Sequence, residues 1–168
     1  ALMNLSGIGM FNIHASGGLK MMQNAVNKAK ELSEVGGFEK PLVIAVTLLT
    51  SIDKKVLNEE LGIPGETSDY VLRWAALAKE AGCDGVVASP EEASILKNEL
   101  GEDFIVVTPA IRFEDELKDD QKRSGTPKNA ITAGSDILVM GRPLLKNGLN
   151  AVKRAYAEIE ECLKKRKS

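Results

Sequence analysis

The stretch GEDFIVVTPAIR, residues 101–112, joins a glycine to a short apolar run with a polar exit, and this unit recurs along the chain. Related runs are GIGMFNIH at 7–14, GCDGVVAS at 82–89 and GSDILVMG at 134–141, while PLVIAVTLLT at 41–50 begins with a proline. Each run is nearly all apolar, without the alternation of a strand that has one solvated face. The five runs therefore predict parallel strands that are covered on both faces.

Helical patterns lie between these runs. Apolar residues recur every three or four positions over 19–32, 71–78 and 149–163, as the buried stripe of a helix requires. The segment TPKNAITAG, 126–134, predicts a shorter helix that begins at Thr-Pro and stops at its glycine.

The segment SPEE, residues 89–92, carries a further start signal. Ser89 is placed as an N-cap, a proline occupies the first helical position, and Glu92 follows three residues after the cap. We expect a helix from here to about Leu100.

The order helix, glycine, strand, loop predicts an α/β fold with right-handed crossovers, either an open sheet or a (β/α)8 TIM barrel. No glycine-rich nucleotide-binding motif follows a strand, which favours the barrel. About five of the eight strands are present, so we expect residues 1–168 to form one domain that is the C-terminal portion of a barrel. Its edges at 10–14 and 137–141 are then expected to be exposed.

Composition excludes several function classes. The 22 Lys and Arg residues nearly balance the 24 Asp and Glu residues, and no basic tract or long apolar span occurs, so neither nucleic acid nor a membrane is an expected partner. Cys83 and Cys162 are far apart and lie in no metal-binding pattern, which predicts packed thiols and no metal site. We expect a soluble, cytoplasmic protein.

The exits of the last two strands carry the strongest site signal. In TIM barrels the loops after the final strands frequently bind phosphate. Here those exits supply Arg112, Gly141 and Arg142: two guanidinium groups, and a glycine whose backbone N–H an oxyanion can approach. Gln121 lies at the far end of the polar stretch after Arg112, where a loop could close over a ligand. The alternative is that both arginines are solvated surface charges.

Two other strand exits are ambiguous. Thr50 could hydrogen-bond a polar ring, but Thr50 or Ser51 could equally cap the next helix. His14 ends the first run without a patterned carboxylate or nucleophile beside it, so a packed, hydrogen-bonded imidazole is favoured over a catalytic one.

An ordered series of segments resembles the orotidine 5'-phosphate decarboxylase family. The segments are MFNIHASGG (10–18), IAVTLLTS (44–51), DGVVASPEEA (84–93), VTPAIR (107–112) and DQKRSGTPKNAITAGSDILVMGRP (120–143). The related hexulose-phosphate synthases share the barrel and a similar His-Ala-x-Gly-Gly segment, but not the later series.

The resemblance implies decarboxylation of orotidine 5'-monophosphate to UMP in pyrimidine biosynthesis, with no cofactor. It implies that Arg112, Gln121, Gly141 and Arg142 bind the phosphate, that Gln121 also lies near the pyrimidine, and that Thr50 contacts the pyrimidine. It also suggests a homodimer in which the partner contributes one aspartate.

The sequence departs from the family pattern in two ways. Ala110 stands where TPGIR is usual, which would stiffen or crowd that turn. The family's catalytic Lys-Asp-Lys-Asp segment, expected just before Ala1, does not occur in these residues, so we expect the 168 residues to hold substrate but to be inactive alone. Another phosphosugar lyase or isomerase and a non-catalytic phosphate-binding barrel are the alternatives.

Overall fold

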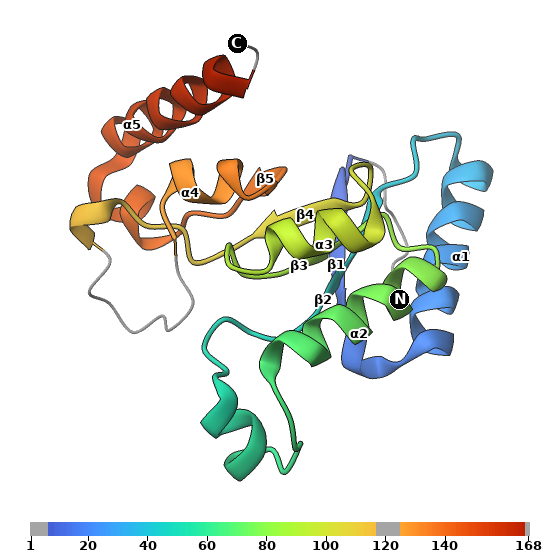
Figure 1. Cartoon of the computed structure of the whole chain (residues 1–168). Coiled ribbons are helices and arrows are strands. Elements are labelled where there is room, and N and C mark those ends of the chain that lie inside the picture. Colours follow the sequence, from blue (N-terminus) through green and yellow to red (C-terminus); the bar gives the residue numbers. More distant parts are fainter. Residues whose placement is uncertain (1–6, 117–124, 167–168) are drawn as a thin grey trace.

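The structure is a computed structural model that describes residues 7–116 and 125–166. Its strands form one parallel sheet in the order of the sequence: β1 Met10–His14, β2 Leu42–Val46, β3 Gly85–Val87, β4 Ile105–Thr108 and β5 Ile137–Leu138. The α-helices follow the same alternation: α1 Leu19–Gly36, α2 Thr67–Glu80, α3 Ala93–Leu100, α4 Pro127–Thr132 and α5 Arg142–Arg166. Three short helical elements lie in the loops: η1 Ala15–Gly17, η2 Val56–Glu60 and η3 Glu114–Glu116. The prediction of an incomplete barrel with five parallel strands in sequence order is confirmed (Figure 1).

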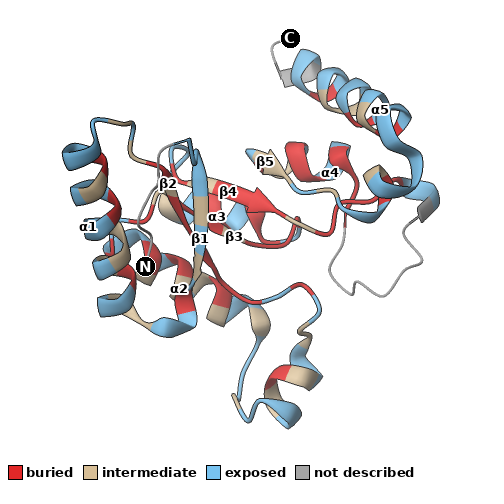
Figure 2. Ribbon diagram, turned by 180° about the vertical axis from the view of Figure 1, so that it is seen from behind, coloured by how far each residue is buried: buried red, intermediate tan, exposed pale blue. Residues whose placement is uncertain are grey.

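The main core lies between the sheet and helices α1 to α3. Buried alanines at 75 and 78 let α2 approach the sheet closely, and Val43, Val86 and Val106 of three successive strands are each fully buried in this core. Figure 2 shows the buried residues concentrated in β2 to β4 and on the inward faces of α1 and α2, whereas α5 is largely exposed.

The expectation of two covered faces holds for the central strands but is wrong for the two outer strands: β5 is only half-buried on both faces, and β1 is exposed on one. In β2, Ile44 and Val46 on the second face are buried like their neighbours. In β1, Phe11 and Ile13 are half-buried against the core, whereas Met10 and the polar residues of the same face are exposed. The residues of the exposed face lie outside the core cluster of the described structure, which agrees with the exposure expected for this outermost strand at 10–14.

Two aspartates fasten the N-terminal ends of neighbouring strands. Asp84, just before β3, accepts hydrogen bonds from Val43 N of β2 and from Lys40 Nζ, both at 2.7 Å. Asp136, just before β5, accepts one from Val106 N of β4 at 2.7 Å. It also pairs with the buried Lys97 of α3 at 2.7 Å. These contacts fix the register of β2 with β3 and of β4 with β5 by way of the residue that enters the second strand of each pair. The C-terminal ends of the paired strands are therefore level with each other.

Helix boundaries follow the predicted signals with two corrections. Thr126 caps α4 as expected, its side chain accepting from Asn129 N at 3.1 Å. The helix predicted from Ser89 instead begins at Ala93. The predicted capping-box contact is present, since Glu92 accepts from both the backbone N–H and the hydroxyl of Ser89, at 2.8 and 2.6 Å, but residues 90–92 form a turn ahead of the helix.

The C-terminal helix is longer than predicted and is interrupted. It begins at Arg142 rather than near residue 149, and at Gly148 the backbone leaves helical geometry with φ 53° and ψ −134°. Because φ is positive there, a residue with a Cβ would be strained. The break redirects the longer second part of α5, which carries Ala151 and Ala155 into a second small core around Phe113.

Gly85 is the tightest point of the sheet. A Cβ built on it would lie 2.2 Å from the carbonyl oxygen of Ile105, its partner on β4. We predict that Gly85→Ala lowers the free energy of unfolding by at least about 2 kcal/mol, because strand backbones cannot move apart without losing their pairing. Urea denaturation measures this loss. Gly9→Ala is the control, since its Cβ would meet no described atom within 4 Å; equal losses in the two variants would contradict the prediction.

Candidate anion-binding site

The pairing of β4 with β5 brings the two predicted arginine exits to one edge of the sheet. Val107 pairs with Ile137 and Thr108 with Leu138, in parallel. Arg112 lies four residues beyond Thr108, and Arg142 lies four residues beyond Leu138. Because parallel strands end at the same edge, the two segments leave the sheet side by side at matching heights.

Arg112 is buried rather than solvated. Its exposed fraction is 6%, and its Nη1 donates to the carbonyl of Ile111 at 2.9 Å. Its Nε is buried, and the described parts of the chain offer it no hydrogen-bond acceptor. A buried donor without an acceptor costs about 1–3 kcal/mol. An anion that reached this guanidinium would therefore meet a donor that is already desolvated.

The backbone of Arg112 is held from the far side of the loop that follows it. Its N–H donates to the carbonyl of Gly125 at 2.9 Å, and Ile111 forms a parallel bridge with Gly125. Gly125 lies against Pro90, whose Cγ would be 2.9 Å from an added Cβ. The start and end of the loop that contains Gln121 are thus tied together, while Gln121 itself lies outside the described residues.

Gly141 and Arg142 form the neighbouring exit. Both are exposed, and a Cβ on Gly141 would meet no described heavy atom within 4 Å, so its backbone is approachable. The carbonyl of Gly141 accepts from Leu144 N and Leu145 N at 3.0 and 3.1 Å, which starts α5. The two predicted arginines therefore differ, because one is buried and the other is at the surface.

Apolar packing connects the two exits. Phe113, directly after Arg112, is 1% exposed and packs with Ala151 and Ala155 of α5. Met140 and Leu144, on either side of the Gly141–Arg142 segment, pack against the same cluster. Sequence reasoning overlooked this cluster, although an aromatic residue at the start of a polar stretch was a usable signal for it.

Thr50 and His14 also lie at the C-terminal ends of the strands, but further from Arg112 and Arg142. Thr50 is 9% exposed and follows β2, which β3 separates from β4. The capping alternative for Thr50 or Ser51 is wrong, because Asp53 caps the next helical segment by accepting from Val56 N at 2.8 Å. His14 is exposed, contrary to the packed imidazole favoured above, because it is on the uncovered face of the edge strand β1.

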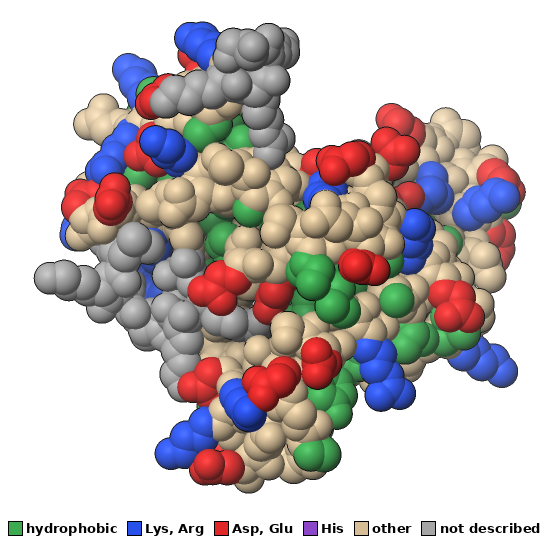
Figure 3. Space-filling model, in the orientation of Figure 1, with side chains coloured by type: hydrophobic (Ala, Val, Ile, Leu, Met, Phe, Trp, Pro, Cys, Tyr) green, Lys and Arg blue, Asp and Glu red, His purple; other side chains and the backbone are tan. Residues whose placement is uncertain are grey.

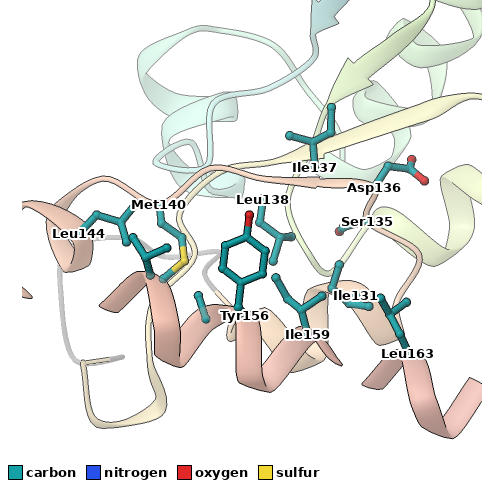
Figure 4. A pocket seen from close by; sticks show the side chains of 12 residues that line it. Ile131, Ser135, Asp136, Ile137, Leu138, Met140, Leu144, Tyr156, Ile159 and Leu163 are labelled. Carbon is teal, nitrogen blue, oxygen red and sulfur yellow. The ribbon is translucent and has the colours of Figure 1, made fainter. Parts of the chain in front are cut away.

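A separate groove of about 650 Å³ lies between α4, β5 and α5. In Figure 4, Tyr156, Ile159 and Leu163 rise from α5 toward Leu138 and Ile131. Its lining is mainly apolar, which is unsuited to an anion. It is an exposed apolar surface beside the edge strand, as the sequence predicted for this side of the sheet.

The cysteines and the overall charge add no second site. Both cysteines are buried, and burial, with a smaller effect of Asp84, raises the pKa of Cys83 to about 11, which disfavours the nucleophilic thiolate. Figure 3 shows acidic and basic side chains interspersed over one face, so attraction of an anion depends on local groups. In the described ranges, no cluster of three potential metal ligands occurs and no helix has the length and hydropathy to cross a membrane.

Comparison with known proteins identifies the family. The model of the orotidine 5'-phosphate decarboxylase / HUMPS family matches residues 3–157. The chain belongs to this family.

Individual relatives agree. Orotidine 5'-phosphate decarboxylase of Coxiella burnetii is 49% identical over 141 residues, 84% of this chain and 58% of that protein. The Heliobacterium modesticaldum enzyme is 42% identical over 95% of this chain and 67% of its own length. The crystal structure of orotidine 5'-phosphate decarboxylase from Lactobacillus acidophilus superposes with a TM-score of 0.74 at 33% identity, covering 91% of this chain and 64% of that one. The chain thus spans about three fifths of the length of these relatives.

Ala110 has a conformation that favours glycine, which gives its departure from the family pattern a physical meaning. Its φ is 60°, in the left-handed region, and it is buried just before Ile111 and Arg112. We predict that Ala110→Gly leaves the free energy of unfolding unchanged or raises it by up to about 1 kcal/mol, since relieved strain outweighs added chain entropy. Thermal or urea denaturation measures the change.

The matched control is Ala76→Gly on the exposed face of α2. That substitution should cost about 1 kcal/mol, as in an ordinary helix interior. Equal losses at positions 110 and 76 would show that the turn before Arg112 is not strained.

Proposed function

We propose that this chain is the substrate-holding part of an orotidine 5'-monophosphate decarboxylase, which forms UMP and CO₂ in pyrimidine biosynthesis. Arg112, Gly141 and Arg142 bind the substrate phosphate, Gln121 reaches it from the loop between the two strand exits, and Thr50 contacts the pyrimidine. The observation that carries the proposal is the buried Arg112, whose Nε is unused within the described structure, next to the exit of Gly141.

A phosphate monoester suits this arrangement. A guanidinium presents a planar fork of donors to phosphate oxygens, and a glycine allows backbone N–H groups to approach an oxyanion closely. The surrounding charges are mixed, so these local donors supply the selectivity. The names of the relatives, orotidine 5'-phosphate decarboxylases, support a nucleotide phosphate as the ligand.

The contribution of these residues to the reaction is binding and orientation. Energy gained at a phosphate remote from the reacting carbon can be used to assemble the reactive geometry. The tie between Arg112 and Gly125 closes the base of the loop that carries Gln121, so phosphate binding and loop position are linked. The proton donor and the carboxylates of the family's Lys-Asp-Lys-Asp segment are not among the 168 residues, so decarboxylation is assigned to the whole protein. A cytoplasmic homodimer without a cofactor completes the proposal.

The direct test is the affinity of the chain for UMP, uridine and inorganic phosphate, by calorimetry. UMP should bind more tightly than uridine, and Arg112→Ala should weaken UMP binding about tenfold to a hundredfold, the value of one or two charge-assisted hydrogen bonds. Arg73→Ala, at an exposed position of α2, is the matched control and should have no effect.

Two results would overturn the assignment. Equal affinity for uridine and UMP would remove the phosphate site. A marked preference for a sugar phosphate over UMP would favour the hexulose-phosphate synthase branch of the family.

The 168-residue chain should bind orotidine 5'-monophosphate without decarboxylating it, because it lacks the family's catalytic segment. Release of CO₂ from carboxyl-labelled substrate measures this directly. Turnover by the purified chain, lost in Arg112→Ala and therefore not from a contaminant, would show that other residues of this chain supply the proton.

A further inference from the structure

We propose that Arg154 is a positioning residue: together with Phe113 and Asp115 it forms a clasp that fastens the segment after Arg112 to α5 and thereby holds Arg112 ready for an anion. The inference rests on the proposed function. It adds residues that touch no substrate and that lie outside the motifs of the sequence analysis.

Arg154 engages this segment in two ways at once. Its Nη2 donates to Asp115 Oδ1 at 2.8 Å, and its Nη1 donates to Asp115 Oδ2 at 3.3 Å, so both prongs of the guanidinium meet one carboxylate. The same guanidinium lies over the ring of Phe113, with its central carbon 4.0 Å from the ring centroid. Its Nε faces Glu158 on the next turn of α5, at 3.5 Å.

The clasp lies close enough to Arg112 in the chain to restrict its backbone. Phe113 is the next residue and Asp115 is three residues on, so the backbone leaving Arg112 is held against α5. On the other side, the N–H of Arg112 is held by the carbonyl of Gly125. The backbone of Arg112 is therefore held by contacts on both sides, and loss of the clasp would remove the contacts on one side.

The ion pair of the clasp, Arg154 with Asp115, is poorly explained as a contribution to overall stability. The side chains of Arg154 and Asp115 are 45% and 67% exposed. Ion pairs between such exposed groups contribute little to folding. Their geometry is nevertheless specific, because a lysine cannot reproduce either the two-pronged contact or the planar stacking on Phe113.

The electrostatic state of the pair fits this role. The hydrogen bond from Arg154 lowers the pKa of the Asp115 carboxyl, and the contact in turn raises the pKa of Arg154. A carboxyl whose pKa is depressed in the folded state keeps its favourable contact at neutral pH and loses it as the pH falls through that pKa. Both groups are therefore charged at neutral pH, as the two-pronged contact requires.

The test compares UMP affinity in the 168-residue chain and its variants Asp115→Asn, Arg154→Ala and Arg154→Lys. Two explanations predict opposite changes in UMP affinity for Asp115→Asn. Removing a negative charge near a phosphate site strengthens anion binding if charge alone matters, whereas opening the clasp weakens it. We expect a loss of about two- to thirtyfold, the usual range for residues that act through others.

Controls separate geometry from charge and from folding. Lys153→Ala removes a positive charge one position earlier on α5 and should leave UMP affinity unchanged. Arg154→Lys retains the charge and should still lose affinity. Thermal unfolding midpoints should stay close to that of the parent chain; if Arg154→Ala fails to fold, the milder Asp115→Asn and Arg154→Lys variants decide the question.

A second readout does not depend on any ligand. The amide of Arg112 donates to Gly125, and its hydrogen exchange, measured by NMR, should become faster in Asp115→Asn and Arg154→Lys but not in Lys153→Ala. One result would overturn the clasp alone: UMP affinity falls in Arg112→Ala, but neither UMP affinity nor the exchange rate of the Arg112 amide changes in the clasp variants. Absence of UMP binding to the parent chain overturns the proposed function, and faster exchange in that case would still identify the clasp as a mechanical element.

Discussion

The parallel pairing of β4 with β5 determines what the rest of this edge of the molecule can do. Two register pairs, Val107 with Ile137 and Thr108 with Leu138, set the heights at which the chain leaves the sheet. The N–H of Val139 continues the pairing by donating to Thr108 O at 2.9 Å, and the hydroxyls of Thr108 and Ser135 are 2.6 Å apart. A slip of one residue would turn every side chain of β5 to the opposite face and separate the two exits.

The two ends of the sheet have different physical roles. At the N-terminal ends, Asp84, Asp136 and the buried Lys97 satisfy backbone donors and acceptors and hold the strands in register. At the C-terminal ends, Arg112 is buried without a full set of partners in the described structure, and the Gly141 backbone is open. Among the described residues, the contacts that hold the strands in register lie at one end, and the unpaired Arg112 Nε lies at the other. That division is the general pattern of barrel enzymes.

The presence of each strand and helix could be predicted from the sequence, because apolar runs and the glycines that end helices are local signals. The α4 cap at Thr126 and the glycines with positive φ at 82, 101 and 134 are local in the same sense. The later start of α3 and the break of α5 at Gly148 are local details that the spacing of apolar residues does not encode. The exposure of His14 depends on which strand forms the sheet edge.

The candidate site was predictable in part for the same reason. Arg112, Gly141 and Arg142 follow strands, so the topology of a parallel sheet alone places them at one edge. That one arginine is buried and the other exposed follows from tertiary packing, as does the contact of Arg154 with Phe113 and Asp115, residues about forty positions apart in the sequence. Long-range pairs of this kind have no signature in a single sequence.

A crystal structure of the chain with bound UMP would show whether the two strand exits hold one phosphate. We expect phosphate oxygens about 3 Å from Arg112 Nε and from a backbone nitrogen at Gly141 or Arg142. A phosphate bound elsewhere, with Arg112 Nε still unengaged beside it, would contradict the claim that these two strand exits form one anion site.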